Sequence, residues 1–174
     1  CRQTRNHGQT ETYYHAFGGG TFRMDTLKAA ILDVKLARLD RANAARRENA
    51  ARYDALLADL PEIETPQVNP DCHMVYHQYS ILCDRREELR QALGDASIGS
   101  GIYYPVPLHR QPCFADLGYK EGDLPVSEAC ARRILALPIH PNLTADDVAR
   151  VAGAIRAFHG AKAAPASAVE GARA

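Results

Sequence analysis

The feature that most constrains the fold is the stretch from residue 24 to residue 60, which contains neither proline nor glycine. It is rich in alanine, leucine, arginine and glutamate, residues with high helix propensity, and Asp25 is a suitable N-cap. Apolar residues then recur at helical spacing, at Leu27, Ala30, Ile31 and Val34. From Asp40 to Arg52 the sequence is mostly charges and alanines, which we interpret as a solvated face. The stretch predicts one long helix or two in series, with a break or an exposed middle near residue 40, as a connector between two domains.

The sequence that follows alternates between strand and helix patterns. A period of two from Val75 to Cys83 is typical of a β-strand. Further strands are expected at 98–104 and 137–139, and helices at 85–94, 127–136 and 146–158, with Asp84, Ser127 and a Thr144/Asp147 capping box as their starts. Val148, Val151, Ile155 and Phe158 share one face of the last helix. This order predicts a small α/β domain from about residue 61 to 159.

The segment from Ile102 to Gln111, IYYPVPLHRQ, is the most informative short stretch. Its two prolines fix their own φ and favour extended backbone at the residue before each, so Tyr103, Tyr104 and His109 are presented with little freedom. Such a loop can hold a ligand. An ordinary strand end whose tyrosines pack on the core would have the same composition, and the segment alone does not separate the two interpretations.

Composition excludes several classes of protein. Lysine plus arginine equals aspartate plus glutamate, at 21 each, so no net field favours nucleic acid. No apolar run approaches the roughly 18 residues of a membrane span, and a soluble protein is expected. The five cysteines are odd in number and lack a C-x-x-C pair, which favours reduced thiols and a cytoplasmic setting.

The two ends of the sequence predict a truncated start and a disordered tail. The first residue is Cys1 and the polar opening has no start signal, so we expect the chain to be cut from a longer one, with residues needed for chemistry upstream. Residues 160–174 are small, polar and patternless, and are expected to form a disordered tail.

Metal binding and nucleophilic catalysis are not favoured. His73 and His77 have the spacing of a metal pair on a helix, but in a strand they would lie about 13 Å apart, too far for one ion. There is no GxSxG elbow, and no cysteine lies in a recognised nucleophile context. No metal ligand and no catalytic residue is therefore assigned in this chain.

Two segments near the start of the chain, one polar and one rich in glycine, are candidates for binding a phosphate. The run Arg5 to Gly8, RNHG, offers several donors to an anion, although a polar surface loop would have the same residues. The glycines Gly18 to Gly20 lack the spacing of a dinucleotide fingerprint, and a flexible or tight turn is the preferred interpretation.

Taken in order, several motifs resemble one family. They are RNHGQ (5–9), Tyr14 and His15, FRMDTLKAAIL (22–32), VYHQY (75–79), YYPVPLHRQP (103–112), GDLPVSE (122–128) and LPIHPNLT (137–144). The family is that of the DegT/DnrJ/StrS-type sugar aminotransferases, pyridoxal-phosphate enzymes of fold type I, and the resemblance covers about residues 2–158. It implies an α/β chain from the C-terminal half of such an enzyme. Residues 1–24 would end the large cofactor domain, 25–60 would be the connecting helices, and 61–159 the small domain.

The resemblance also implies roles for individual residues. Asn6 would bind the phosphate of the cofactor held by the neighbouring subunit of a homodimer. Tyr103 and Tyr104 lie where the family usually has a His-Tyr pair associated with the diphosphate of the nucleotide sugar, so Tyr103 departs from the pattern and cannot carry positive charge. Thr21 replaces a frequent asparagine and leaves the substrate-binding role of Arg23 open. His109 could line the same pocket or be a structural histidine.

The implied chemistry is transfer of an amino group, with glutamate as donor, to a keto group of a nucleotide-linked sugar, for polysaccharides or glycosylated natural products. In the family the Schiff-base lysine precedes RNHG, and neither Lys28, Lys35 nor Lys120 sits in a matching motif, so this chain alone should be inactive. Two alternatives remain: a sugar dehydratase of the same family, in which the lysine is replaced, and a non-catalytic α/β module that binds a ligand or a partner.

Overall fold

The computed structural model describes residues 1–160, in two compact units that are considered separately: residues 1–40 and the residues from Arg41 on. The division falls within the segment expected to contain the connecting helices. Most of the expected tail, residues 161–174, lies outside the described residues. Within the part described, no helix is both long and apolar enough to cross a membrane.

The first unit is a small hairpin followed by a helix. Strands β1 (Gln9–Glu11) and β2 (Tyr14–His15) pair antiparallel, and α1 spans Thr26–Leu36. The predicted N-cap is confirmed, because the Asp25 carboxylate accepts from the backbone N–H groups of Leu27 and Lys28 at 2.9 and 3.1 Å. No residue of α1 is buried, and its apolar face is open to solvent. Leu27, Ile31 and Val34 are 76%, 61% and 64% exposed.

The long helical stretch forms two helices in series, which is one of the two arrangements predicted from the sequence. Helix α2 spans Leu39–Leu57, and the break lies at residues 37–38. The second half of α2 carries the buried residues Asn49, Ala50, Tyr53, Leu56 and Leu57. This half therefore belongs to the core of the second unit.

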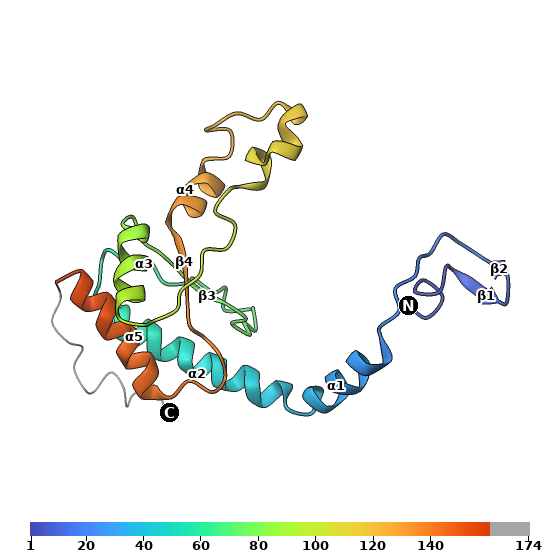
Figure 1. Cartoon of the computed structure of the whole chain (residues 1–174), viewed down its shortest axis with the longest axis horizontal. Helices are drawn as coiled ribbons and strands as arrows, with labels where there is room; N and C mark the ends of the chain where they lie inside the picture. Colours follow the sequence, from blue (N-terminus) through green and yellow to red (C-terminus); the bar gives the residue numbers. More distant parts are fainter. Residues whose placement is uncertain (161–174) are drawn as a thin grey trace. The chain divides into compact units, whose positions relative to one another are not determined.

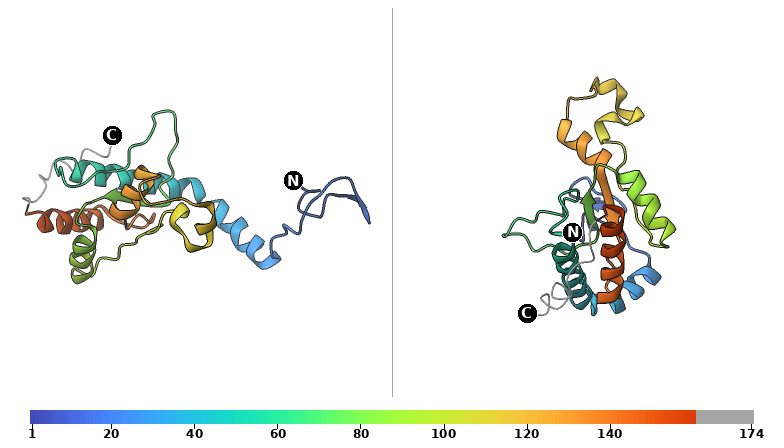
Figure 2. Two further views of the ribbon diagram at one scale, coloured as in Figure 1. Left: turned by 90° about the horizontal axis from the view of Figure 1, so that it is seen from above. Right: turned by 90° about the vertical axis from the view of Figure 1, so that its left-hand side faces the viewer.

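In the second unit, three helices pack around a two-stranded sheet (Figures 1 and 2). Strand β3 (Tyr79–Leu82) pairs antiparallel with β4 (Ile134–Leu137), and Tyr79 lies opposite Leu137. Helices α2, α3 (Arg86–Asp95) and α5 (Ala145–Phe158) cover the sheet, whereas α4 (Pro125–Arg133) leads directly into β4. The expected alternation is confirmed where β3 forms: Tyr79, Ile81 and Cys83 are at most 1% exposed. The Thr144/Asp147 capping box of α5 is also confirmed.

Two expected strands are shorter in the structure. The strand expected at 98–104 is reduced to one bridge, in which Gly101 and Ala136 exchange backbone hydrogen bonds of 3.0 and 2.7 Å. Glycines 99 and 101 and the nearby Pro105 weaken a strand here, since glycine loses more entropy on ordering and proline cannot donate. The strand expected from Val75 begins only at Tyr79, where β4 provides a partner.

Helix starts were also mispredicted twice. Asp84 does not cap α3, because its carboxylate pairs with the Arg133 guanidinium at 2.5 Å; Arg85 occupies the N-cap position without a side-chain bond. Helix α4 begins at Pro125, which is well suited to a first helical turn, and not after Ser127. It ends at Arg133 because residues 134–137 pair with β3, so the third strand also lies earlier than the expected 137–139.

Two 3-10 helices follow the proline-bearing segment, and a stacked pair of tyrosines lies in the core of the second unit. Between Tyr104 and α4 the chain forms η1 (Leu108–Arg110) and η2 (Pro112–Leu117). The Tyr53 and Tyr79 rings stack with centroids 5.0 Å apart, and the Tyr53 hydroxyl donates to the Pro138 carbonyl at 3.0 Å. Burial raises the pKa of Tyr53, so the phenol stays protonated as a donor.

Candidate functional site

In the first unit, Asn6 and Arg23 are directly bonded. Arg23 Nη1 donates to Asn6 Oδ1 at 3.1 Å, and Asn6 Nδ2 donates to Gln9 Oε1 at 2.7 Å. A backbone bridge between Asn6 and Thr21 brings the two segments together. Two of the predicted site residues thus lie together, and the carboxamide of Asn6 is held in one orientation with one N–H left to donate.

The backbone of the RNHG run has a different role from the one expected. The N–H groups of Asn6, His7 and Gly8 donate to carbonyls of Gln3 and Gly20 at 2.8 to 3.1 Å, so none of them is directed at an anion. His7 and Gly8 both have positive φ, 60° and 69°. The side chains of this run are therefore the groups that remain for a ligand.

The three consecutive glycines allow close packing of the backbone against this turn. A Cβ at Gly19 would lie 2.3 Å from the Gly8 nitrogen and 2.7 Å from the His7 carbonyl carbon. Only glycine fits there. The preferred interpretation was a flexible or tight turn and not a dinucleotide fingerprint, and this geometry corresponds to the tight turn.

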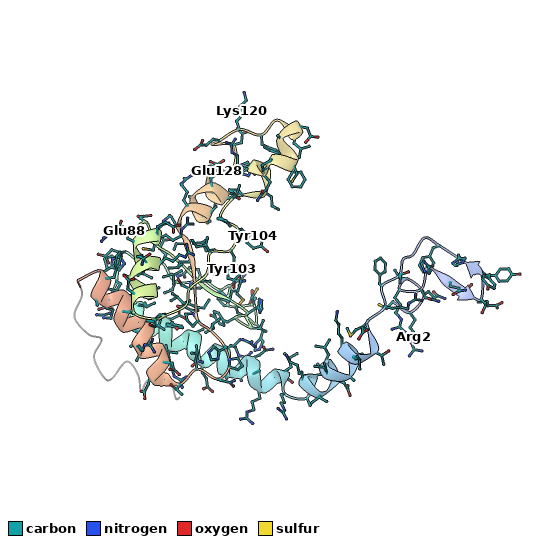
Figure 3. All side chains as sticks on the ribbon, in the orientation of Figure 1. Arg2, Glu88, Tyr103, Tyr104, Lys120 and Glu128 are labelled. Carbon is teal, nitrogen blue, oxygen red and sulfur yellow. The ribbon has the colours of Figure 1, made fainter. Side chains whose placement is uncertain are left out.

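Besides Arg38, which follows α1, the first unit carries three exposed arginines, Arg2, Arg5 and Arg23 (Arg2 is labelled in Figure 3). Among the residues that the structure describes, none of the three pairs with a carboxylate. An arginine bonded to an oriented carboxamide, with two further exposed arginines in the same unit, favours an anion such as phosphate.

In the second unit, Tyr103, Tyr104 and His109 line one cavity of about 500 Å³ beside α4. Tyr103 and Tyr104 are labelled in Figure 3. The other walls of the cavity are Pro107, Leu108, Leu124, Ser127, Cys130, Ala131 and Ile134. The cavity is mostly apolar and aromatic, with the phenols, the Ser127 hydroxyl and the His109 imidazole as its main polar groups. This composition suits a flat ring with a polar substituent.

The conformation of Tyr104 was mispredicted. Its φ is +59°, in the left-handed region, and not extended as expected before Pro105. The tyrosine is 76% exposed, so burial of its ring does not account for this backbone. Strain of this kind is typical of ligand-binding segments.

His109 meets both of its expected alternatives, because it lines the cavity and is also hydrogen-bonded. Its Nε2 lies 2.9 Å from Glu128 Oε1, and the side chains are only 5% and 7% exposed. Both Glu128 oxygens accept from the Gly122 N–H at 3.0 Å, and the Tyr119 ring meets the imidazole edge-on. The bonds from His109 and Gly122 hold the pKa of the Glu128 carboxyl below its usual value.

The sequence did not identify every residue that shapes these cavities. Glu128 belongs to the GDLPVSE motif, but its partner His109 lies 19 residues earlier and no spacing rule links them. Arg46 was counted among the solvated charges of α2, yet it lines a second cavity with His77 and His140. Lys120, labelled in Figure 3, lies in an exposed loop and lines neither cavity. Within residues 1–160, no three histidine, cysteine, aspartate or glutamate side chains gather as metal ligands would.

Comparison with known proteins agrees with these features. A family model described as the DegT/DnrJ/EryC1/StrS aminotransferase family matches residues 1–156. The chain is 42% identical over 161 residues to a Geobacillus stearothermophilus protein named pleiotropic regulatory protein, covering 91% of this chain and 43% of that protein. It is 40% identical over 155 residues to the dTDP-3-amino-3,4,6-trideoxy-alpha-D-glucose transaminase of Streptomyces venezuelae, covering 89% and 41%.

Solved structures show the same relationship. The crystal structure of DesV from S. venezuelae superposes with a TM-score of 0.84 at 39% identity, covering 90% of this chain and 42% of that one. A Brucella abortus aminotransferase of the family gives 0.81 at 37% identity, covering 91% and 42%. The chain thus spans about two fifths of the length of these relatives.

The expected family and the expected α/β fold of part of a fold type I enzyme are both confirmed. Because the family model matches from residue 1 to residue 156 and the fold superposes on solved members, this chain belongs to the DegT/DnrJ/EryC1/StrS aminotransferase family.

Proposed function

We propose that this chain is the C-terminal portion of a pyridoxal-phosphate-dependent sugar aminotransferase, which moves an amino group from glutamate to a keto group of a nucleotide-linked sugar. The family match supports the reaction class, and the dTDP-sugar transaminase among the relatives supports a nucleotide-sugar substrate. We further propose a cytoplasmic homodimer with the active site at the subunit interface. Five free thiols are in keeping with a reducing compartment.

The observation that carries the cofactor assignment is the Asn6–Arg23 pair. Asn6 retains a donor, Arg23 fixes its orientation, and neighbouring arginines are unpaired within the described residues. These groups fit the phosphate of a cofactor bound mainly by residues outside this chain. Asn6 would donate to the phosphate of the neighbouring subunit, and the arginines would lower the free energy of the dianion.

Pyridoxal phosphate, when bound, supplies the electron sink for amino transfer. The residues of this chain bind and orient. The phenols of Tyr103 and Tyr104 would donate to the diphosphate of the sugar nucleotide, and the apolar cavity wall would exclude water from a ring. His109 and Glu128 would hold the loop in place. No lysine of this chain is assigned to proton transfer, so we propose that the isolated chain is inactive.

The alternatives receive less support. A sugar dehydratase would use the same cofactor and the same residues of this chain, but the Streptomyces relative at 40% identity is named a transaminase. A stand-alone module does not account for a family match over residues 1–156 with enzymes.

The test is the absorbance spectrum of the full-length gene product with pyridoxal phosphate, before and after glutamate. We expect a band of protein-bound cofactor that shifts when glutamate is added. A bound chromophore without a shift would favour the dehydratase, and no bound chromophore would favour the module.

A further inference from the structure

Arg46 lines the second cavity of the Arg41-onward unit, and one nitrogen of its guanidinium group is buried. Its Nε is inaccessible to solvent and has no hydrogen-bond partner. Within residues 1–160, the one hydrogen bond that Arg46 makes is a long one, from Nη1 to Asn43 Oδ1 at 3.5 Å. No carboxylate of residues 1–160 pairs with it. Buried donors in native proteins are nearly always bonded, so a cation of this kind requires an explanation.

The cavity around Arg46 contains donors and no acid. It measures about 520 Å³, and its polar side chains are Arg46, His77, Gln78, Ser100, Tyr103 and His140; no aspartate or glutamate of residues 1–160 lines it. His140 Nδ1 accepts from the Asn142 N–H at 3.3 Å, so the neutral ring carries its proton on Nε2 and can donate. The chemistry of these groups is complementary to an anion.

The walls of this cavity are held by bonds outside it. Buried Asn49 donates to the carbonyls of His140 and Leu143 at 3.5 and 3.3 Å, which fixes the turn that carries the His140 ring. Gly101 is tied to Ala136 by two backbone bonds, and this positions Ser100. A site fixed in this way loses little entropy when a ligand binds.

We propose that this cavity binds the carboxylate of a small organic acid, with the Arg46 guanidinium across its two oxygens and Ser100 and His140 as further donors. One permanently charged group matches a single negative charge, whereas a phosphate dianion would call for more. Tyr103 lines this cavity and the aromatic one, so the two are neighbours with a shared wall. Only the physiological source of the carboxylate rests on the proposed function: glutamate and the keto acid that it becomes would be the natural ligands.

The test is titration calorimetry of glutarate into the full-length gene product, because glutarate has two carboxylates and neither an amino nor a keto group to react. We expect Arg46→Gln to weaken binding about tenfold or more, as for the loss of a charge-assisted hydrogen bond. The matched control is Arg47→Gln, which removes the same charge from the adjacent position of α2, outside the cavity. It should bind within about twofold of the parent protein. Ser100→Ala should weaken binding severalfold, and it decides the matter if Arg46→Gln does not fold.

Several results would overturn the inference. They are absence of glutarate binding, equal loss in the two arginine variants, tighter binding of inorganic phosphate than of glutarate, and an acidic side chain from outside this chain paired with Arg46 in a crystal structure. The two proposals can fail separately. If glutarate binding depends on Arg46 but glutamate does not change the cofactor spectrum, the carboxylate site is supported and the aminotransferase activity is contradicted. If glutamate changes the spectrum but glutarate binding does not depend on Arg46, the aminotransferase activity is supported and the carboxylate site is contradicted.

Discussion

His109 Nε2 and Glu128 Oε1 lie 2.9 Å apart, with both side chains more than nine-tenths buried. The pair joins the proline-bearing loop to α4 across 19 residues of sequence. Glu128 also binds the Gly122 N–H, so one carboxylate holds both ends of the segment that includes η1 and η2.

Glu128→Gln should lower the melting temperature at neutral pH, and the loss should depend on pH. The folded pKa of this carboxyl is below the ordinary 4.5, so its stabilising contribution is complete above about pH 4.5 and is lost as the pH falls through the folded pKa. Thermal unfolding at pH 7 and near pH 3 should show the gap between parent and variant narrowing. Glu121→Gln, on the same loop, is the control and should behave like the parent at both pH values. A gap that stays constant with pH would contradict the assignment.

Asn6→Ala in the full-length gene product should weaken retention of pyridoxal phosphate by about tenfold, as expected for loss of a hydrogen bond to a charged group. Arg23→Gln should have a smaller effect, because it removes the orienting bond to Asn6 Oδ1 and leaves the donor. Equilibrium dialysis of the cofactor measures both. Thr10→Val, in the same hairpin, is the control. Unchanged cofactor affinity in Asn6→Ala would remove its proposed role.

Tyr104→Gly should stabilise the fold and weaken substrate binding. Glycine accepts the φ of +59° without the steric cost of a side chain, so the free energy of unfolding should rise by about 1 kcal/mol. The lost phenol should raise KM for the nucleotide sugar severalfold. Tyr104→Ala keeps the strained backbone and should show the second effect without the first. Chemical denaturation and steady-state kinetics separate the two, and a destabilised glycine variant would show that the backbone is not strained.

Asn49→Ala should cost about 1 to 3 kcal/mol of unfolding free energy, because the carbonyls of His140 and Leu143 lose a buried donor. Urea denaturation measures the change. Asn142→Ala replaces an exposed asparagine of the same turn and should change stability by less than about 0.5 kcal/mol. Equal effects of the two substitutions would be inconsistent with this role of Asn49.

The isolated chain should self-associate through α1, whose Leu27, Ile31 and Val34 are exposed on one helix. Light scattering at tens of micromolar should show oligomers, and Leu27→Glu combined with Ile31→Lys should reduce them. Lys28→Glu on the same helix should leave the association unchanged. A monodisperse monomer of the parent chain would refute the prediction.

The structural features that depend on local sequence signals were predicted well. The cap at Asp25, the Thr144/Asp147 box and the alternation from Tyr79 to Cys83 each depend on residues within a few positions of one another. The failures depended on distant partners. The Gly101 segment pairs with Ala136, and Asp84 leaves its helix for Arg133. Arg46 looked like an ordinary surface charge because the other segments that line its cavity come from three later parts of the chain.

The contacts of Arg156 have a consequence for synthesis. From α5, its guanidinium donates to the Leu56 carbonyl at 3.1 Å and to both oxygens of Asp59, about 100 residues earlier in the chain. The first helix of the Arg41-onward unit is thus fastened by its last. Until the ribosome has made α5, helix α2 cannot pack against it, and the apolar face of α2 stays exposed to solvent. Folding of this unit therefore cannot be completed until α5 has left the ribosome, and a nascent chain that stalls before α5 exposes the surface that chaperones recognise.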